Sequence, residues 1–264
     1  MSHQINYMLT NIPKAEFQTL ADNMQLVSLE KGINLFDKSE IIQYIYFPTG
    51  AIVSMLSDLE DGTSVEVYSV NNTGVVGMGL LGQPSPYRAQ VRSSGLAYRI
   101  SSNKMQEIRD LCPAYLKGAY ESSMHMLMQM SQNIACSKRH SIEQQLIRWM
   151  LTTIDKTSNN HIHTTHQEIS EILGFRREAI TLNLAKLSRN NIIKIKRGGI
   201  EVIDRVMMED RSCECYWNDL QIDRSFSRLT TSISSSALGR ALPKHHSGQP
   251  LKPRLSLQFE EITF

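Results

Sequence analysis

The sequence predicts an α+β protein: an N-terminal antiparallel β-roll, then a long helix, then a C-terminal helical domain that ends in a β-hairpin. Three observations predict this order. Residues 27–100 consist of short apolar runs broken by glycine, which is typical of antiparallel strands. After Pro113, apolar residues recur in steps of four and three. Residues 165–202 contain two short amphipathic segments and then a glycine-centred hairpin.

The predicted roll contains runs rich in β-branched and aromatic residues at 44–47, 52–56 and 65–70. Asp61 and Gly62 separate the last two runs, and both residue types tolerate the positive φ angles of a tight hairpin turn. The spacing therefore predicts an antiparallel barrel or roll.

Two further segments accompany these strands. A short amphipathic helix is predicted from Pro13, with Phe17 and Leu20 facing inward. Residues 74–92 combine four glycines and two prolines with a following arginine. Such a segment could cradle a phosphate or form a tight surface turn, and the glycine content favours the turn.

The long helix after Pro113 carries the a/d pattern of a coiled-coil seam. This seam is too long for a small domain to bury alone, so we expect a homodimer helix. Met124, Met126 and Met128 widen the apolar stripe and indicate packing rather than a metal site. The seam residues are Leu116, Tyr120, Ser123, Leu127, Met130 and Ile134. A second helix is predicted over 142–154, with a buried face formed by Leu146, Ile147, Met150 and Leu151.

Residues 165–187 predict two short helices joined by a turn. Thr165 and Glu168 form a capping-box pattern, and Gly174 ends the first helix. The first helix has an apolar face of Ile169, Ile172 and Leu173, and the second has one of Ala179, Ile180, Leu184 and Leu187. Outward positions of the second helix carry Arg176, Arg177, Glu178, Thr181 and Lys186. This chemistry suits the DNA major groove, where Arg reads guanine and Glu accepts from cytosine; the alternative is a helical hairpin with a solvated charged face.

A basic hairpin follows this helix pair. Gly198 and Gly199 are expected to form its turn, after a loop at 157–164 that precedes the helix pair. Its inward face is predicted to contain Ile193, Ile195, Ile200 and Val202, and its tip or outer face Lys194, Lys196 and Arg197. Two helices followed by a basic hairpin indicate a winged helix-turn-helix, whose wing can meet phosphate.

Charge is unevenly distributed along the chain, although the formal net charge is only +2. Residues 1–137 hold 9 Lys and Arg against 12 Asp and Glu, and residues 138–205 hold 12 against 7. An acidic N-terminal part followed by a basic central part is expected when only the central part binds a polyanion. The sequence shows no apolar stretch long enough for a membrane span and no signal-peptide pattern, so we expect a cytoplasmic protein without membrane contact.

The reactive residues do not predict catalysis. The four cysteines are scattered without a Cys-x-x-Cys pair, so reduced thiols without metal or disulfide are expected. His161, His163 and His166 flank a helix cap without carboxylate or cysteine partners and are interpreted as polar loop residues. Serine-hydrolase, Walker, zincin and dinucleotide-binding motifs are absent from the sequence. No enzyme activity and no cofactor are therefore expected.

Over roughly residues 20–205 the chain resembles the Crp/Fnr family of bacterial transcription regulators. The match is strongest at Gln167-Glu168-Ile169, at Leu173-Gly174 and at Arg177-Glu178-x-Ile180-Thr181, and segment 136–151 also looks like the family's junction between dimer helix and DNA-binding domain. The resemblance implies a regulator that binds a palindromic DNA site as a homodimer, with RNA polymerase as a further partner. It also implies a cyclic-nucleotide-binding-like jelly-roll sensor at 1–112, a dimerisation helix at 113–137 and a winged helix-turn-helix at 138–224. Residues 225–264 are predicted to be a disordered tail.

The resemblance also assigns roles at the predicted DNA interface. Arg177 and Glu178 take the places of the family's base-reading pair, and Leu182 replaces a third base-reading arginine, which leaves only apolar contact with a base. Asn183 stands where the motif is usually apolar. The full predicted set is Arg176, Arg177, Glu178, Thr181, Leu182, Lys186, Lys196 and Arg197, of which Arg176, Lys186, Lys196 and Arg197 mainly hold phosphate.

The effector pocket departs from the family pattern. Family members that bind cyclic nucleotides carry Gly-Glu, then Arg-Ser or Arg-Ala-Thr, around a phosphate loop. The corresponding residues here are Gly77, Met78, Arg88 and Ala89, with Met130 and Ser131 on the long helix. Met78 cannot accept a hydrogen bond from a ribose hydroxyl as glutamate would, so control by cAMP is not expected and the effector is unknown. The alternative function is a ligand-sensing or protein-interaction module of the same fold with weak or lost DNA binding.

Overall fold

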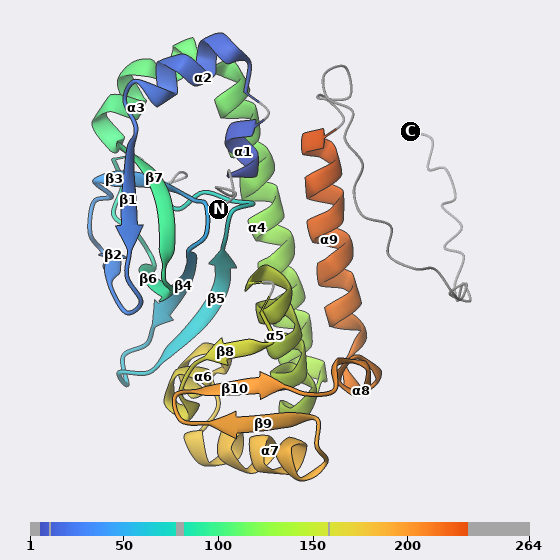
Figure 1. The fold of residues 1–264 in the computed structure, drawn as a ribbon. Coiled ribbons are helices and arrows are strands. Elements are labelled where there is room, and N and C mark those ends of the chain that lie inside the picture. Colours follow the sequence, from blue (N-terminus) through green and yellow to red (C-terminus); the bar gives the residue numbers. More distant parts are fainter. Residues whose placement is uncertain (1–5, 11, 78–81, 158, 232–264) are drawn as a thin grey trace, which may run out of the picture.

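The computed structural model describes residues 6–10, 12–77, 82–157 and 159–231. A β-roll lies on one side of the long helix α4, a C-terminal domain lies at one end of it, and helix α9 lies alongside it (Figure 1). The elements before α4 are α1 (Tyr7–Thr10), α2 (Lys14–Ala21), β1 (Gln25–Leu29), β2 (Asn34–Phe36), β3 (Tyr44–Pro48), β4 (Ile52–Asp58), β5 (Ser64–Val70), β6 (Arg88–Ser93), β7 (Gly95–Ser101), α3 (Ser102–Ile108) and the 3-10 turn η2 (Arg109–Leu111).

The roll is formed by two antiparallel sheets with strand orders β1-β7-β3 and β2-β6-β4-β5. Apolar side chains from both sheets pack together between them, including Leu29 of β1, Tyr46 of β3, Val53 of β4 and Val91 of β6. The predicted hairpin between β4 and β5 is confirmed, and Gly62 adopts a φ of 81° in its turn. The predicted α+β class is confirmed with it.

Helix α2 begins directly after Pro13, as predicted, but only one of its two expected core residues is buried. Leu20 is fully buried, whereas Phe17 is exposed. Side chains three residues apart are separated by about 60° around a helix axis, so Phe17 falls at the rim of the face that Leu20 centres. The prediction for Phe17 was wrong.

Helix α4 (Pro113–Arg139) begins with proline at its first position and ends with Lys138 and Arg139, which suit the negative end of the helix dipole. One face packs on the roll, where the Asn133 amide donates to the Val67 carbonyl at 2.9 Å. Another face meets α9 (Glu214–Thr231), where His125 Nε2 lies 2.8 Å from Asp223 Oδ1. A third face is exposed.

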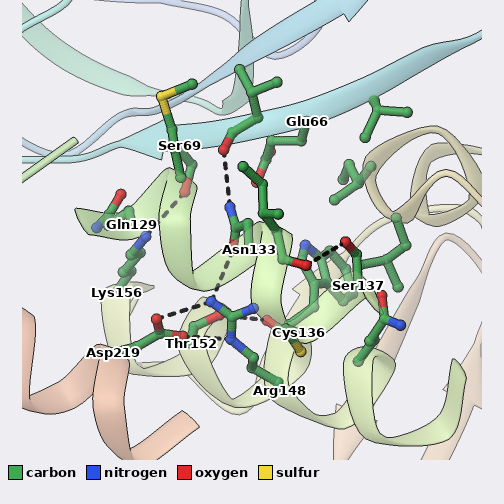
Figure 2. Close-up of a pocket in the computed structure, with 18 of the residues that line it drawn as sticks. Glu66, Ser69, Gln129, Asn133, Cys136, Ser137, Arg148, Thr152, Lys156 and Asp219 are labelled. Carbon is green, nitrogen blue, oxygen red and sulfur yellow. Dashed lines mark hydrogen bonds and ion pairs between the residues drawn. The ribbon is translucent and has the colours of Figure 1, made fainter. Parts of the chain in front are cut away.

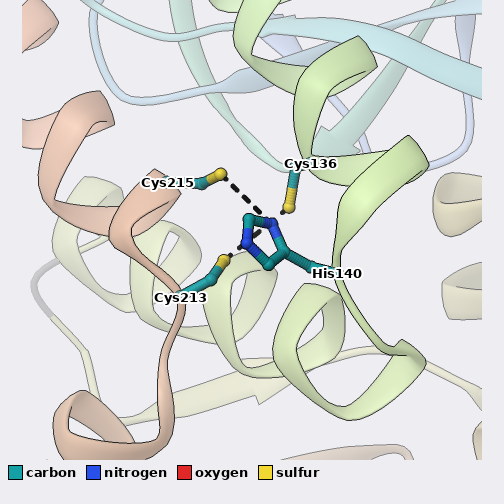
Figure 3. Close-up of side chains that lie close together, drawn as sticks. All are labelled: Cys136, His140, Cys213 and Cys215. Atoms are coloured by element: carbon teal, nitrogen blue, oxygen red, sulfur yellow. Dashed lines mark hydrogen bonds between the residues drawn. The ribbon is translucent and has the colours of Figure 1, made fainter.

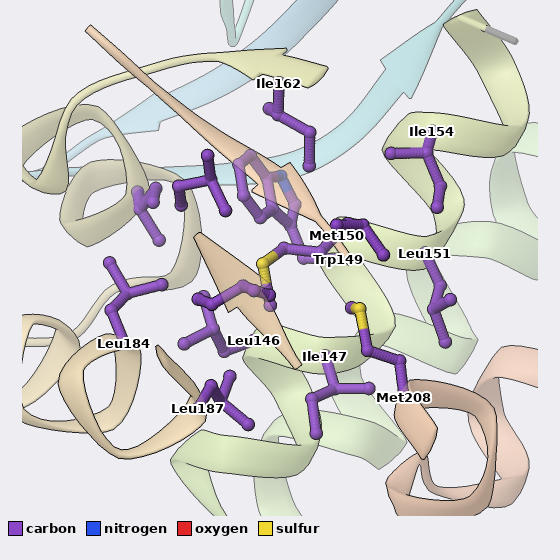
Figure 4. Packing of buried hydrophobic residues seen from close by; sticks show 14 of the residues in the cluster. Leu146, Ile147, Trp149, Met150, Leu151, Ile154, Ile162, Leu184, Leu187 and Met208 are labelled. Carbon is purple, nitrogen blue, oxygen red and sulfur yellow. The ribbon is translucent and has the colours of Figure 1, made fainter. Parts of the chain in front are cut away.

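The C-terminal domain has its own hydrophobic core. Its elements are α5 (Ile142–Thr157), β8 (His161–His163), α6 (His166–Leu173), α7 (Arg177–Arg189), β9 (Ile193–Lys196), β10 (Gly199–Val202) and α8 (Arg205–Arg211). Figure 4 shows side chains of α5 at the centre of this core, between α7 and the strands. The buried face predicted for α5 is confirmed, since Leu146, Ile147, Met150 and Leu151 are fully buried. Each contributes about 1.5–3 kcal/mol by leaving water.

Two details of the predicted hairpin were wrong, and so was the loop predicted before α6. Lys196 pairs with Gly199, so the turn residues are Arg197 and Gly198. Gly199 belongs to β10, where an added Cβ would lie 2.6 Å from the carbonyl oxygen of Ile162. Ile195 is exposed because it lies near the tip of an edge strand, whereas Ile200 beside it is covered by β8. The segment expected to be a loop before α6 contains β8, which forms only by pairing with β10.

Helix α9 extends to Thr231, past residue 225 where the predicted tail begins. It docks on α4 and α5 through polar side chains: Asp219 binds Arg148, and Asn218 lies 3.4 Å from Gln132. Tyr216 and Leu220 of α9 also pack against the core of the C-terminal domain, but two apolar residues form too short a period to predict the helix from the sequence. Residues 232–264 of the predicted tail lie outside the described residues. None of the described helices combines the length and the apolar character needed to cross a membrane.

Candidate DNA interface

Helices α6 and α7 form the predicted helix-turn-helix, and their ends are fixed by local hydrogen bonds. The capping box is present: Thr165 Oγ1 accepts from the Glu168 N–H at 3.1 Å, and Glu168 Oε2 accepts from the Thr165 N–H at 2.8 Å. Gly174 ends α6 with a φ of 69°, and its N–H donates to the Ser170 carbonyl. These bonds set the turn after which α7 begins.

One face of α7 is buried and the opposite face is open. Ile180, Leu184 and Leu187 are fully buried against α5 and the hairpin. The residues predicted to face DNA lie on the open side: Arg176, Arg177, Glu178, Thr181, Leu182 and Lys186 are all exposed. Leu182 is 69% exposed, which is unusual for leucine on a helix whose opposite face is fully buried. The open face therefore combines two arginines, a carboxylate and a bare apolar side chain.

The start of α7 is tied to the start of α6. His166 Nδ1 lies 3.0 Å from Thr181 Oγ1, and the Thr181 hydroxyl donates to the Arg177 carbonyl at 2.9 Å. Burial, together with the positive charge of Arg177, lowers the pKa of His166. At neutral pH the imidazole is therefore uncharged and adds no charge to the surface. The sequence interpretation of His166 as a loop residue was wrong, because it is the first residue of α6.

The predicted cations differ in how they are paired. Lys186 Nζ lies 2.5 Å from Glu143 Oε2 of α5, and Lys196 Nζ lies 2.8 Å from Glu201 Oε2 on the adjacent strand. Across the described parts of the chain, the guanidinium groups of Arg176, Arg177 and Arg197 form no such ion pairs. These three arginines are therefore the cations most available to a polyanion, with Arg197 in the turn of the hairpin beside α7 (Figure 1).

The roll and the C-terminal domain contact each other directly. Lys31 of the roll bridges to the capping glutamate, with its Nζ 2.9 Å from Glu168 Oε1. Although burial acts to raise the pKa of Glu168, hydrogen bonds from Lys31 and from the Thr165 backbone hold that pKa below its usual value. The Arg92 guanidinium lies over the Trp149 ring at 5.8 Å from its centroid.

A cavity of about 250 Å³ lies where the roll, α4, α5 and α9 meet (Figure 2). Lys156 donates to Ser69 of β5 at 3.0 Å across it, and Arg148 donates to Asn133 of α4 at 2.8 Å. The C-terminal domain is thus joined to the roll and to α4 by polar contacts, none of which had a signal in the sequence.

A second cavity, of about 420 Å³, lies between the roll and α4. It is lined by Gly77 together with Tyr68, Tyr87, Ser122, His125, Met126 and Gln129, among others. Gly77 has a φ of 91°, and an added Cβ would lie 3.0 Å from Ile42 Cγ2. Of the residues predicted for an effector pocket, only Gly77 lines this cavity; Met78 lies outside the described residues.

The remaining predicted pocket residues are engaged elsewhere. Arg88 Nη2 donates to Asp58 Oδ1 at 2.8 Å and to Ser64 Oγ at 3.0 Å. The hydrogen bond from Arg88 lowers the pKa of Asp58, so this pair is charged at neutral pH. Ala89 is fully buried in the roll core and Met130 packs against that core, while Ser131 is exposed and donates to the Leu127 carbonyl.

Comparison with known proteins agrees with this geometry. Residues 144–211 match the model of the Crp-like helix-turn-helix domain. A protein assigned to the Crp/Fnr family of transcriptional regulators, from Eubacterium rectale, superimposes with a TM-score of 0.64 at 15% identity, covering 78% of this chain and 98% of that one. FixK2 from Bradyrhizobium japonicum superimposes with a TM-score of 0.61 at 14% identity, covering 72% of this chain and 98% of that one. A CRP-family transcriptional regulator from Thermus thermophilus superimposes with a TM-score of 0.62 at 15% identity, covering 70% of this chain and 96% of that one. Comparison with curated protein sequences found no match.

The chain has the Crp/Fnr fold with a Crp-like helix-turn-helix domain. The resemblance inferred from the sequence is therefore confirmed. Sequence reasoning missed Lys31 and Glu143, which bind residues of the helix-turn-helix from the roll and from α5. No spacing rule links residues 137 or 43 positions apart, so only the fold could reveal them.

Proposed function

We propose that this Crp/Fnr-type chain is a sequence-specific DNA-binding transcription regulator, in which α7 reads bases in the major groove and the β9–β10 hairpin contacts phosphate. The observation that carries the proposal is the open face of α7. Arg177 and Glu178 stand exposed at its first turn, on a helix whose inner face is fully buried. Arg pairs with guanine and Glu accepts from cytosine N4, and a helix anchored in this way can place both against base edges.

The test is selection of bound fragments from a random duplex pool, followed by titration of the selected site against salt. We expect enrichment of a two-fold symmetric sequence and an affinity that falls steeply as salt rises. The alternative, a ligand-sensing or protein-interaction module of this fold without DNA binding, predicts no enrichment and no binding to duplex DNA at low salt.

The same proposal includes a homodimer formed through α4. Four of the predicted seam residues form an exposed stripe on the single chain: Leu116, Tyr120, Leu127 and Ile134. Tyr120 is 68% exposed and Ile134 62%. An apolar stripe along a 27-residue helix is typical of a surface that a second copy covers. Met130 of the predicted seam instead packs against the roll.

Replacing Leu127 by glutamate is expected to convert a dimer into a monomer at micromolar concentration. The symmetric interface would bury two carboxylates near each other, which weakens association by at least about 3 kcal/mol, or more than a hundredfold. Sedimentation velocity measures the change. Leu26→Glu, at an exposed leucine of β1, is the matched control and should leave the dimer intact. A monomeric wild-type chain, or a dimeric Leu127→Glu chain, would contradict the proposed seam.

We further propose that cAMP does not control this protein. Arg88, which would bind the phosphate by family resemblance, is committed to Asp58 and Ser64. Titration calorimetry with cAMP and cGMP is expected to show no binding heat in the wild-type chain. Asp58→Asn, which removes the competing carboxylate from Arg88, is the variant in which anion binding would be recovered. A micromolar site for either nucleotide in the wild-type chain would refute the proposal.

A further inference from the structure

Three of the four cysteines, which are scattered in the sequence, converge with a histidine in the structure (Figure 3). Cys136 and His140 come from the C-terminal end of α4, Cys213 comes from the turn between α8 and α9, and Cys215 comes from the first turn of α9. The ligand atoms of these four residues all lie within 4.8 Å of one another. The three cysteines are buried, and His140 is nearly so.

Local structure explains how four ligand atoms face one point. Residues four apart share a helix face, so Cys136 in the last turn of α4 and His140 at its C-cap project to the same side. Helix α8 ends at Arg211, with Ser212 as its C-cap, and Cys213 and Cys215 flank the first residue of α9. The docking of α9 on α4 brings these two pairs together.

Two of the separations match the edges of one tetrahedral metal centre, and the four ligand atoms all lie within 4.8 Å of one another. Zinc bonds of about 2.3 Å to sulfur and about 2.0–2.1 Å to nitrogen place neighbouring sulfurs about 3.8 Å apart, and sulfur about 3.5 Å from nitrogen. Cys136 Sγ and Cys213 Sγ are 3.8 Å apart, and Cys215 Sγ and His140 Nδ1 are 3.4 Å apart. A disulfide needs about 2.05 Å between sulfurs. The ligands of a four-iron cluster sit on different iron atoms and must lie further apart than these four.

The histidine has the outer partner that a metal-bound imidazole usually has. Its Nδ1 faces Cys215, while its Nε2 lies 3.2 Å from Glu214 Oε2. A carboxylate that accepts from the outer ring nitrogen fixes the tautomer that leaves Nδ1 free to bind metal.

We propose that Cys136, His140, Cys213 and Cys215 bind one zinc ion as a closed Cys3His structural site. Zinc favours tetrahedral sulfur and nitrogen ligands, and four protein ligands leave no open position for catalysis. The ion ties α4 to α9 across 77 residues of sequence, at the end of α4 that leads into the helix-turn-helix. It therefore stabilises the junction between the long helix α4 and the C-terminal domain. The site is independent of any DNA or effector.

The first experiment is elemental analysis of the full-length chain purified under reducing conditions, together with titration of the metal-stripped protein with Co²⁺. We expect about one zinc per chain, and cobalt absorption with the charge-transfer bands of three thiolates in a tetrahedral field. A chelator strong enough to remove zinc should lower the melting temperature, because metal binding stabilises the folded state.

Variants assign the ligands. Cys213→Ser and Cys215→Ser should each lose stoichiometric zinc and about a third of the charge-transfer intensity. Cys112→Ser is the matched control, since Cys112 is equally buried but lies at the start of α4, in an apolar cluster that contains none of the four proposed ligands. Glu214→Gln, at an exposed side chain, should keep the fold while weakening zinc binding about 10- to 100-fold. Substoichiometric zinc in the wild-type chain, zinc retained by both cysteine variants, iron in place of zinc, or a Cys136–Cys213 disulfide in the purified protein would each overturn the proposal.

Discussion

Replacing Arg177 by alanine is expected to weaken binding to the selected DNA site by about 1–3 kcal/mol, or roughly 5- to 150-fold in Kd, and to relax base preference at one position of each half-site. Arg177 is exposed at the first turn of α7, and its guanidinium makes no ion pair with the described residues, so its full hydrogen-bonding capacity is available to a base. The measurement is a competition of the selected site against single-base variants, with wild-type and Arg177→Ala protein.

Two further variants separate base reading from charge. Arg197→Ala, in the turn of the hairpin, should weaken all sequences alike and reduce the slope of log K against log salt by about one. Arg109→Ala removes the same charge from the exposed 3-10 turn before α4 and should change neither quantity. Unchanged base preference in Arg177→Ala would remove α7 from the major groove.

The largest expected loss of stability follows from Arg148→Met. Arg148 Nε and Nη2 donate to the two carboxylate oxygens of Asp219 at 2.6 and 2.9 Å, and both side chains are nearly buried. Removing the arginine leaves a buried carboxylate without its cation. We expect the free energy of unfolding to fall by about 3–5 kcal/mol at pH 8, measured by denaturant unfolding.

The loss should depend on pH. Burial already raises the pKa of Asp219, while Arg148 acts to lower it, so removing Arg148 raises the folded-state pKa further. A carboxyl whose pKa is raised by folding contributes stability below its unfolded pKa and loses that contribution as pH rises through its folded pKa. The deficit of Arg148→Met should therefore be smaller at pH 5 than at pH 8.

The double variant Arg148→Met/Asp219→Leu tests the cause. It removes both charges and substitutes apolar side chains, so it should recover most of the stability that the single variant loses. A single-variant loss below about 1 kcal/mol, or a double variant as unstable as the single one, would show that the buried pair does not hold α5 to α9.

Elements with a strong local signal were predicted well. Thr165 and Glu168 specify the start of α6, and Gly174 its end, because each group bonds within a few residues of itself. The buried face of α5 follows from helical periodicity, since Leu146, Ile147, Met150 and Leu151 must share one side of any helix they form. The hairpin at Gly62 follows from the same kind of local constraint.

Elements without such a signal were missed. Strand β8 has three residues and exists only because β10 offers it hydrogen bonds. Helix α9 was missed because Asp219 and Asp223, which help to dock it, are polar residues without a recognisable helical period. Lys186 and Lys196 were expected to hold phosphate, and no pattern in the sequence indicated that Glu143 and Glu201 pair with them in the fold.

The sequence by itself thus determined the fold class, the order of roll, long helix and winged helix-turn-helix, and the face of α7 that points outward. Those features depend on caps, turns and apolar periods, which act between residues a few positions apart. The tertiary structure alone decided which cations stay unpaired, where Arg88 is held, and that Cys136, His140, Cys213 and Cys215 meet at one point. Most of those features depend on contacts between residues tens of positions apart, and such contacts leave no period in the chain.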